Sequence, residues 1–310
     1  MRHQGFTLLA LTLVAIGCGA PEPGDAPAVA PATHDAKLSV YVVNYPLAYF
    51  AERIGGDLVD VDFPAPPDGD PAFWVPDADR VAAYQGADLI LLNGAGYAGW
   101  VDRVTLPPSR LVNTSMSFKD RYVVSEDAVV HSHGPEGEHD HGDTAFTTWL
   151  DPTLAIEHAA AIRDAFAAAR PEHEAVFAGG FESLKTDLLE LDASLEQVTA
   201  GQAQTPVLGS HPVYQYLSRR YELNLRSVHF EPDEDPDAKG WQALDEILSE
   251  HPARWMLWEA EPLATTAEKL EGRGVASVVF DPCGNVPEEG DFLTVMQRNL
   301  SNLERVLAGP

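Results

Sequence analysis

The stretch PEHEAVFAGGFESLKTDLLELDASLEQV, residues 171–198, decides the fold. Its apolar residues recur in alternating steps of four and three, the spacing that places side chains on one face of a helix. They are Phe177, Phe181, Leu184, Leu188, Leu191, Leu195 and Val198. Pro171 suits a first helical turn, and Gly201 suits a stop. The spacing predicts one helix of about 40 Å, with Gly179 and Gly180 as the point where it would kink.

Short apolar runs alternate with amphipathic segments on both sides of this helix. We expect strands at 38–43, 88–92, 228–231 and 276–280, among others. Such alternation is typical of α/β folds with mainly parallel sheets. We therefore predict two Rossmann-like lobes, residues 37–170 and 201–310, joined by a long backbone helix over 171–200. The alternative is a single large domain that contains the helix.

The amino terminus has the pattern of an export signal. Arg2 precedes a mostly apolar run, 6–16, which is too short to span a bilayer. Residues 1–17 thus form a predicted signal peptide, and its end, Ala-Ile-Gly before Cys18, resembles a bacterial lipobox. That resemblance implies cleavage before Cys18 and its acylation, which would anchor the chain in a lipid bilayer. Residues 18–36, rich in Pro, Ala and Gly, predict a flexible tether. The alternative is an ordinary secretory signal with an incidental cysteine.

The net charge of the chain limits the kinds of binding partner that we expect. The formal net charge is -28, which argues against nucleic acid or an anionic surface as partner. A cation ligand suits this excess, although we expect most of the acids to be solvated surface residues. If Cys18 carries lipid, Cys283 has no mate, and we expect no structural disulfide.

Several motifs of the first half carry a family resemblance. They are YPL at 45–47, IGGD at 54–57, DGDP at 68–71 and GADLILLNGAGYAGW at 86–100. With them the chain resembles the solute-binding proteins of zinc and manganese ABC importers. The resemblance implies two α/β lobes joined by one rather rigid helix. It also implies a monomer that is not an enzyme, held outside the cytoplasmic membrane, which delivers Zn²⁺ to an ABC permease; Mn²⁺ or another divalent ion stays open.

The resemblance implies four metal ligands, of which this chain keeps two. The family has histidines in Asp-Pro-His and in His-x-Trp-Leu-Asp-Pro, where this chain has Ala72 and Thr147. His211, in GSHPVYQYL, corresponds to the third ligand, and Asp281 corresponds to the fourth. A histidine at the third position resembles the zinc branch of the family more than the manganese branch.

A histidine-rich segment, residues 131–141, precedes the second ligand position. It contains His131, His133, His139 and His141 among acids, without a periodic apolar face. We predict a mobile loop that makes transient contact with zinc, copper or nickel, which neutral imidazoles bind. Capture by histidines should weaken as the pH drops through about 6.

The two missing ligands leave three functional hypotheses open. In the first, the protein still delivers a divalent cation, and substitutes complete the site: the loop histidines, His229, Glu231, Glu259 or Cys283. In the second, the cleft binds a metal chelate or small organic ligand, with Phe73, Trp74 and Trp149 lining a pocket. In the third, the protein is a lipid-anchored metallochaperone or accessory protein. An enzyme is the weakest hypothesis, because Gly-Ser-His lacks a nucleophile-elbow pattern and an obvious triad.

Overall fold

The computed structural model describes Met1 and residues 36–124, 130–132, 138–140 and 144–309, with only the backbone of 130–132 and 138–140. Contacts divide the chain into two units, Met1–Ala36 and Lys37–Pro310. The predicted signal peptide, lipobox cysteine Cys18 and tether lie outside the described residues, apart from the first and last positions. Among the helices that are described, none is both long and apolar enough to cross a membrane.

The first lobe is built on a four-stranded parallel sheet in the order β2-β1-β3-β4. Its strands are β1 (Leu38–Val42), β2 (Val59–Asp62), β3 (Leu89–Leu92) and β4 (Leu111–Asn113). The β-branched and leucine side chains of β1 and β3 enter the core, where Val40 and Ile90 are fully buried. Buried central strands of this kind are typical of parallel sheets covered on both faces.

The second lobe repeats this plan with a parallel sheet in the order β10-β9-β7-β8. Its strands are β7 (Val207–Gly209), β8 (Leu225–Ser227), β9 (Trp255–Trp258) and β10 (Ala276–Val279). Two parallel α/β lobes confirm the predicted fold class. In both lobes, the loops that follow the strands' carboxyl ends are the places where α/β proteins build their sites.

Helices flank the two sheets. They are α1 (Tyr45–Gly55), α2 (Ala78–Gly86), α3 (Pro152–Ala169), α5 (Gln215–Tyr221), α6 (Ala238–Glu250), α7 (Ala264–Glu271) and α8 (Phe292–Leu307). Aspartate side chains cap the first turns of four of them: Asp77, Asp151, Asp237 and Asp291. Such caps satisfy amide groups that the helix itself leaves unpaired, which fixes where each helix begins.

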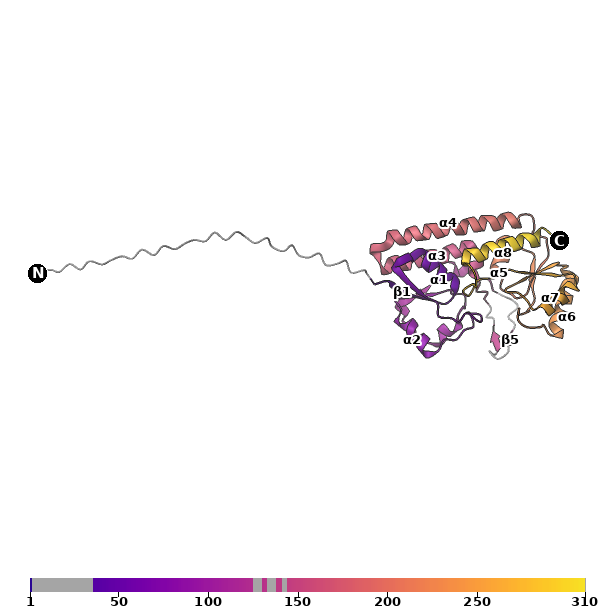
Figure 1. Cartoon of the computed structure of the whole chain (residues 1–310), viewed down its shortest axis with the longest axis horizontal. Helices are drawn as coiled ribbons and strands as arrows, with labels where there is room; N and C mark the ends of the chain where they lie inside the picture. Colours follow the sequence, from indigo (N-terminus) through magenta and orange to yellow (C-terminus); the bar gives the residue numbers. More distant parts are fainter. Residues whose placement is uncertain (2–35, 125–129, 133–137, 141–143, 310) are drawn as a thin grey trace. The chain divides into compact units, whose positions relative to one another are not determined.

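The predicted linking helix is α4 (Glu174–Thr199), 26 residues long, preceded by a 3₁₀ turn at Pro171–His173. At about 1.5 Å per residue it spans about 39 Å, and it is continuous through Gly179 and Gly180. It packs on α1, α3 and α8, as Figure 1 shows along the top of the ribbon. One continuous core runs beneath it through both lobes, so residues 37–310 pack as one body.

Gly180 allows α4 to approach α1 closely. A Cβ at Gly180 would lie 2.6 Å from the Ile54 carbonyl oxygen, whereas one at Gly179 meets nothing within 4 Å. We expect Gly180→Ala to lower the free energy of unfolding by about 1–3 kcal/mol through overpacking. The matched Gly179→Ala should instead raise it by about 0.5–1 kcal/mol through helix propensity. Urea titration of both variants measures this; equal shifts would show that the α1–α4 approach is not tight.

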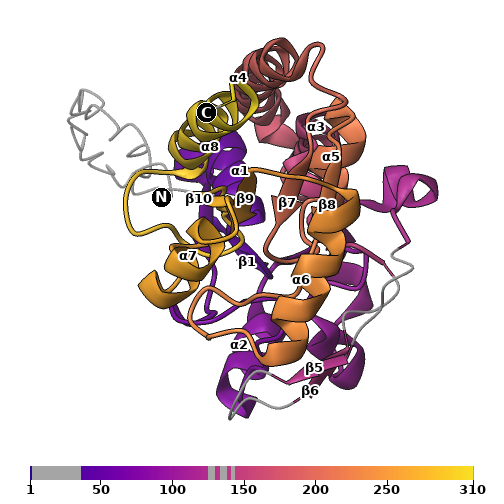
Figure 2. The ribbon, with the colours of Figure 1, turned by 90° about the vertical axis from the view of Figure 1, so that its right-hand side faces the viewer.

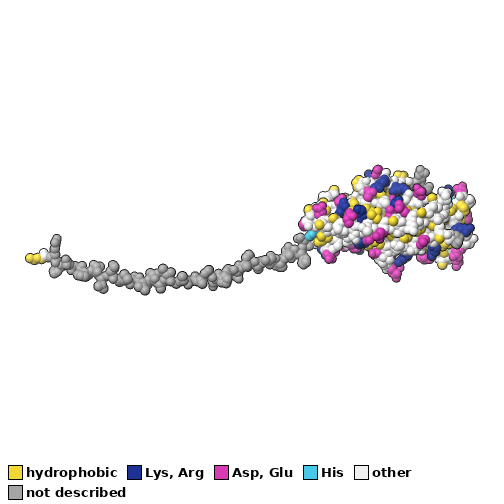
Figure 3. Space-filling view, turned by 90° about the horizontal axis from the view of Figure 1, so that it is seen from above, with side chains coloured by type: hydrophobic (Ala, Val, Ile, Leu, Met, Phe, Trp, Pro, Cys, Tyr) yellow, Lys and Arg dark blue, Asp and Glu magenta, His cyan; other side chains and the backbone are white. Residues whose placement is uncertain are grey.

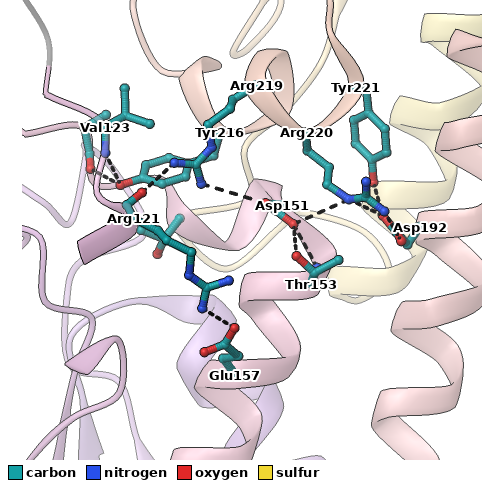
Figure 4. Close-up of polar contacts among 12 residues, drawn as sticks. Arg121, Val123, Asp151, Thr153, Glu157, Asp192, Tyr216, Arg219, Arg220 and Tyr221 are labelled. Atoms are coloured by element: carbon teal, nitrogen blue, oxygen red, sulfur yellow. Dashed lines mark hydrogen bonds and ion pairs between the residues drawn. The ribbon is translucent and has the colours of Figure 1, made fainter. Parts of the chain in front are cut away.

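A second junction joins helix α5 of the second lobe to the rest of the body (Figure 4). Arg220 binds Asp192 of α4 with two nitrogens, at 3.1 and 2.6 Å, and Tyr221 donates a hydrogen bond to the same carboxylate. Arg220 also lies 3.9 Å from Asp151, the cap of α3. Because Asp192 is largely buried, these contacts tie α5 to the linking helix and to the first lobe.

Tyr216 extends this junction to the ends of the histidine-rich region. Its hydroxyl accepts a hydrogen bond from the Val123 amide and donates one to the Ala145 carbonyl, at 3.1 and 3.0 Å. Ala145 in turn donates to the carbonyl of Val123 at 2.9 Å. The chain therefore enters and leaves the region 124–144 at one point, against α5.

Two local expectations were wrong, and one strand was missed. Residues 228–231 are not a strand: the edge strand is Leu225–Ser227, although Val228 and Phe230 still donate backbone hydrogen bonds to Gly209 and Ser210. Strand β4 was not predicted. The histidine-rich segment is not wholly a loop, because β5 (Val130–Ser132) and β6 (Glu138–Asp140) pair antiparallel, with His131 opposite His139.

The acidic residues do not form a single patch on the face drawn in Figure 3. There they are spread among lysines and arginines and between apolar side chains. This distribution fits the expectation that most acids are solvated surface residues.

Candidate functional site

His211 lies at the carboxyl end of strand β7, as the sequence predicted. The backbone after the strand stays attached to both neighbours, because the Ser210 amide donates to Leu257 and its carbonyl accepts from Phe230. A Cβ at Gly209 would lie 2.9 Å from the Ser227 hydroxyl. The glycine at the end of β7 therefore lets β8 pack closely against it. The His211 side chain is thereby fixed in place and buried, with 4% of the residue exposed.

Two glutamates flank the imidazole of His211. Its Nε2 lies 3.4 Å from Glu231, and its Nδ1 lies 3.4 Å from Glu259. Both glutamate side chains are about three-quarters buried. The ring of His229 packs edge-on against His211, with the ring centroids 5.6 Å apart. The surroundings of His211 are therefore strongly acidic, with a carboxyl group near each ring nitrogen.

Glu259 follows strand β9 and lies at the centre of an acidic group. Burial raises the pKa of Glu259 well above its usual value, and the negative charges of Asp70, Glu231 and Asp281 raise it further. A carboxyl surrounded by like charges in a desolvated place holds its proton to higher pH. A cation would relieve this repulsion, so the charge distribution favours a cationic ligand.

Asp281 follows strand β10, where the sequence placed the fourth ligand. Its carboxylate accepts a 2.6 Å hydrogen bond from the Cys283 amide. Asn299 of α8 holds its backbone with two further hydrogen bonds, at 3.0 and 2.7 Å. Burial raises the pKa of Asp281, and the amide hydrogen bond opposes that shift. The side chain is therefore oriented by its surroundings before any ligand arrives.

Asp70 is the first-lobe residue that sequence reasoning missed. It stands two positions before Ala72, on the same loop, and its carboxylate accepts a 2.8 Å hydrogen bond from the Ala72 amide. Burial raises the pKa values of Glu259 in the second lobe and of Tyr97 in the first, and the charge of Asp70 raises both further. The first lobe thus adds a negative charge to the acidic group around Glu259, from the loop in which Ala72 replaces the family's histidine. In the sequence, the sign of this residue is that Asp70 belongs to the DGDP motif at 68–71.

The other lost ligand position joins the lobes directly. Thr147 is 4% exposed, and its hydroxyl donates a 2.5 Å hydrogen bond to the carbonyl of Val213, just after His211. Close by, the indole of Trp149 donates a 2.7 Å hydrogen bond to the Pro282 carbonyl of the second lobe. Thr147 and Trp149 therefore hold the two lobes in contact through direct hydrogen bonds.

The remaining candidates differ in how well they are placed. Cys283 is 1% exposed, and burial together with the charges of Asp281 and Asp291 raises the pKa of its thiol. Because the thiolate is the metal-binding form, Cys283 is the least suited of the substitutes. His133 and His141 lie outside the described residues, and only the backbone of His131 and His139 is described.

The structure does not present a preformed ligand set. In the described part of the chain, no group of three or more His, Cys, Asp and Glu side chains is placed to hold a metal ion. The position of Glu231 and Glu259 explains this, because they face different nitrogens of His211, which point in different directions.

Comparison with known proteins identifies the family. Residues 40–306 match the model of the family described as zinc-uptake complex component A, periplasmic, or ZnuA. The chain belongs to the ZnuA family. The match covers both lobes and the linking helix, which is nearly all of the packed body, residues 37–310.

Curated relatives of this ZnuA-family chain are named for metal binding. The zinc-binding lipoprotein AdcA of Streptococcus pneumoniae R6 is 26% identical over 285 residues, which are 87% of this chain and 56% of AdcA. The manganese-binding lipoprotein MntA of Halalkalibacterium halodurans is 26% identical over 226 residues, or 72% of this chain and 69% of MntA. The chain thus spans little more than half the length of AdcA.

Solved structures support the fold of this ZnuA-family chain. The metal-dependent lipoprotein YcdH of Bacillus subtilis superposes with a TM-score of 0.75 at 21% identity, covering 87% of this chain and 99% of YcdH. The Zn(II)-bound ZnuA-like domain of Streptococcus pneumoniae AdcA gives 0.73 at 22% identity, with coverage of 87% and 99%. At this identity the likeness concerns the fold alone.

Proposed function

We propose that this protein is the extracytoplasmic binding component of a metal ABC importer, which captures a divalent cation and passes it to a membrane permease. The observation that carries the proposal is the buried His211 with a glutamate 3.4 Å from each ring nitrogen. Membership of a family named for zinc uptake favours a binding protein over an enzyme. Zn²⁺ is our first choice of cargo, because AdcA, which matches over 285 residues, is named as zinc-binding.

The proposed ligand set differs from four imidazoles. His211 and Asp281 stand at the two metal-ligand positions that the chain keeps from the family pattern. Glu231 and Glu259 are the substitutes nearest to His211, and Asp70 is the ligand that the first lobe contributes. Zn²⁺ accepts imidazole and carboxylate ligands, and Mn²⁺ accepts carboxylates readily. We therefore expect weaker discrimination between Zn²⁺ and Mn²⁺ than a histidine-dominated site gives, which accords with relatives named for either metal.

Several parts of the proposal concern residues that the structure does not describe. We propose that Cys18 is acylated and anchors the protein in the bilayer on the outer side of the cytoplasmic membrane. Relatives that are named lipoproteins support this. We also propose that His131, His133, His139 and His141 make the first contact with the cation, before His211 and the cleft acids hold it. His229 and Cys283 stay secondary candidates for ligands.

A calorimetric titration tests the proposal. Zn²⁺ and Mn²⁺ are titrated separately into the parent protein and into a variant that lacks residues 131–141. We expect one-to-one binding of Zn²⁺ that survives the deletion, because the cleft supplies its own ligands. Binding that disappears with the deletion would show that the cleft is not a cation site and would overturn the proposal.

Cation capture should also release protons. Because the pKa of Glu259 is raised well above its usual value, this side chain keeps its proton at mildly acidic pH, where an ordinary glutamate has lost it. A bound cation displaces that proton. Titrations at mildly acidic pH in two buffers of different ionisation enthalpy measure the release, which Glu259→Gln should reduce. Equal proton release from parent and variant would remove Glu259 from the site.

A further inference from the structure

The segment that follows β10 contacts the first lobe through successive residues. Figure 2 looks along the molecule, with the second lobe, in orange and yellow, in front of the first. The indole of Trp149 donates to the carbonyl of Pro282 at 2.7 Å, and the amide of Tyr45, at the start of α1, donates to the carbonyl of Gly284 at 3.0 Å. Next in the chain is Asn285, whose side chain donates to the loop after β2. The segment therefore runs along the boundary between the lobes.

The side chain of Asn285 gathers several backbone carbonyls of that first-lobe loop. Its Nδ2 lies 2.8 Å from the carbonyl oxygen of Pro66 and 3.2 Å from those of Pro67 and Gly69. Its Oδ1 accepts a 2.8 Å hydrogen bond from the amide of Val286. Because this bond fixes the oxygen within its own loop, the nitrogen and its two hydrogens face the first lobe.

The first-lobe loop has few hydrogen bonds of its own to hold it. Its sequence at 66–71 is PPDGDP, and its three prolines lack the amide hydrogen that a backbone hydrogen bond needs. Asp70 directly follows the carbonyls that Asn285 gathers. It also orients the chain beyond it, because its carboxylate accepts from the Ala72 amide and its carbonyl accepts from the Phe73 amide. The place of Asp70 therefore depends on the contacts of Asn285.

The same second-lobe segment begins with Asp281, four residues before Asn285. One short stretch of chain thus carries a cation ligand of the proposed site at one end. At its other end it holds the loop that contains Asp70. The charges of Asp70 and Asp281 both act on Glu259, so the loop and the segment bring acids of both lobes to one place.

We propose that Asn285 is a positioning residue of the cation site: it holds the loop of Asp70 against the second lobe and thereby slows the departure of a bound cation. This inference rests on the proposed function. The hydrogen bonds of Asn285 are exposed to solvent, so water can replace them when the loop opens. The hydrogen bond from Trp149 to Pro282 is buried and keeps the lobes together meanwhile.

The first test is the rate at which Zn²⁺ leaves the protein, measured by stopped flow with an excess of a fluorescent chelator. Asn285→Leu keeps the size and charge of the side chain and removes its donors. We expect it to release Zn²⁺ about fivefold faster, the factor for a lost exposed hydrogen bond. Asn224→Leu is the matched control, because Asn224 donates to Gln204 within the second lobe. We expect the control to release Zn²⁺ as the parent does.

Two further measurements distinguish positioning from a general structural role. Hydrogen exchange of residues 66–73 in the metal-free protein should be faster in Asn285→Leu than in the parent and the control, because the loop opens more often. The double variant with Asp70→Asn should release Zn²⁺ no faster than Asp70→Asn alone, because Asn285 acts through Asp70.

The outcomes separate this inference from the proposed function. If the parent binds Zn²⁺ and Asn285→Leu releases it at the parent's rate, the positioning role is overturned and the proposed function stands. Unchanged hydrogen exchange of the loop, or effects of Asn285→Leu and Asp70→Asn that simply multiply, also overturn it. A parent protein that binds neither Zn²⁺ nor Mn²⁺ overturns the proposed function itself, and the positioning role with it.

Discussion

Replacing His211 with alanine will weaken Zn²⁺ binding by at least about 100-fold. Changing a residue that merely supports a metal ligand costs about 10- to 100-fold in affinity, and His211 is proposed as a ligand itself. Its imidazole is buried between two glutamates, so the variant keeps the acids and loses the nitrogen donor that Zn²⁺ prefers. Competition with a fluorescent zinc chelator measures the change.

A matched control separates a lost ligand from a damaged fold. His173→Ala removes a half-exposed histidine from the turn before α4, and we expect it to bind Zn²⁺ as the parent does. Asp70→Asn tests whether the first lobe contributes to Zn²⁺ binding. We expect it to lower the Zn²⁺ affinity about tenfold, within the range for groups that support a metal ligand. If His211→Ala binds Zn²⁺ as tightly as the parent while remaining folded, the cation is held elsewhere and the cleft assignment is lost.

The fold was predictable where local signals and long patterns agree. The spacing of Phe177, Leu184 and Leu191 predicted α4, and those side chains are buried beneath it. The starts of α2 and α3 carry a local signal in the same way, because Asp77 and Asp151 are residues that favour helix caps and both cap these helices. Such features depend on residues within one or two turns of each other, so the sequence carries them without knowledge of the tertiary structure.

Short strands were harder, because their neighbours define them. Strand β8 has only the residues Leu225–Ser227, and its position follows from pairing with β7, where Val207 lies opposite Leu225. The apolar alternation of 228–231 is real, since Val228 and Phe230 are buried, but these residues pack in a core beyond the end of the ladder. Periodicity shows which side chains are buried and leaves the strand's register to the tertiary fold.

The site divides in the same way. The positions of His211 and Asp281 were predictable, because each belongs to a motif at a strand's carboxyl end. The effect of Asp70 on Glu259 was not, since it depends on how a first-lobe loop lies relative to the second lobe. Nor was the hydrogen bond from Thr147 to Val213, which makes a lost ligand position into a contact between lobes. Interactions between lobes are set by the tertiary structure, and a single sequence does not show them.

Acidification will destabilise the protein through His158, a buried histidine of α3. Its two ring nitrogens contact the hydroxyls of Thr114 and Thr148 at 2.6 and 2.8 Å, and the ring of Phe118 packs edge-on against it. Burial lowers the pKa of His158 to about 3, whereas a histidine in an unfolded chain has a pKa of about 6.5. Between these values the unfolded chain binds a proton that the native protein excludes.

The sign follows from this difference in proton binding. The free energy of unfolding falls as the pH drops from about 6.5 towards about 3, by up to about 1.4 kcal/mol per pH unit. Above about pH 6.5 His158 adds no pH dependence. Urea titrations of the parent at pH 7 and pH 4.5 should therefore differ by about 2–3 kcal/mol from His158 alone, added to the effect of the carboxylates. The glutamine of His158→Gln can still hydrogen-bond both threonines. Because glutamine does not titrate, we expect this variant to lack the part of the stability loss that comes from His158. If parent and variant lose the same stability between the two pH values, His158 is charged in the native protein, and its surroundings must accommodate the proton.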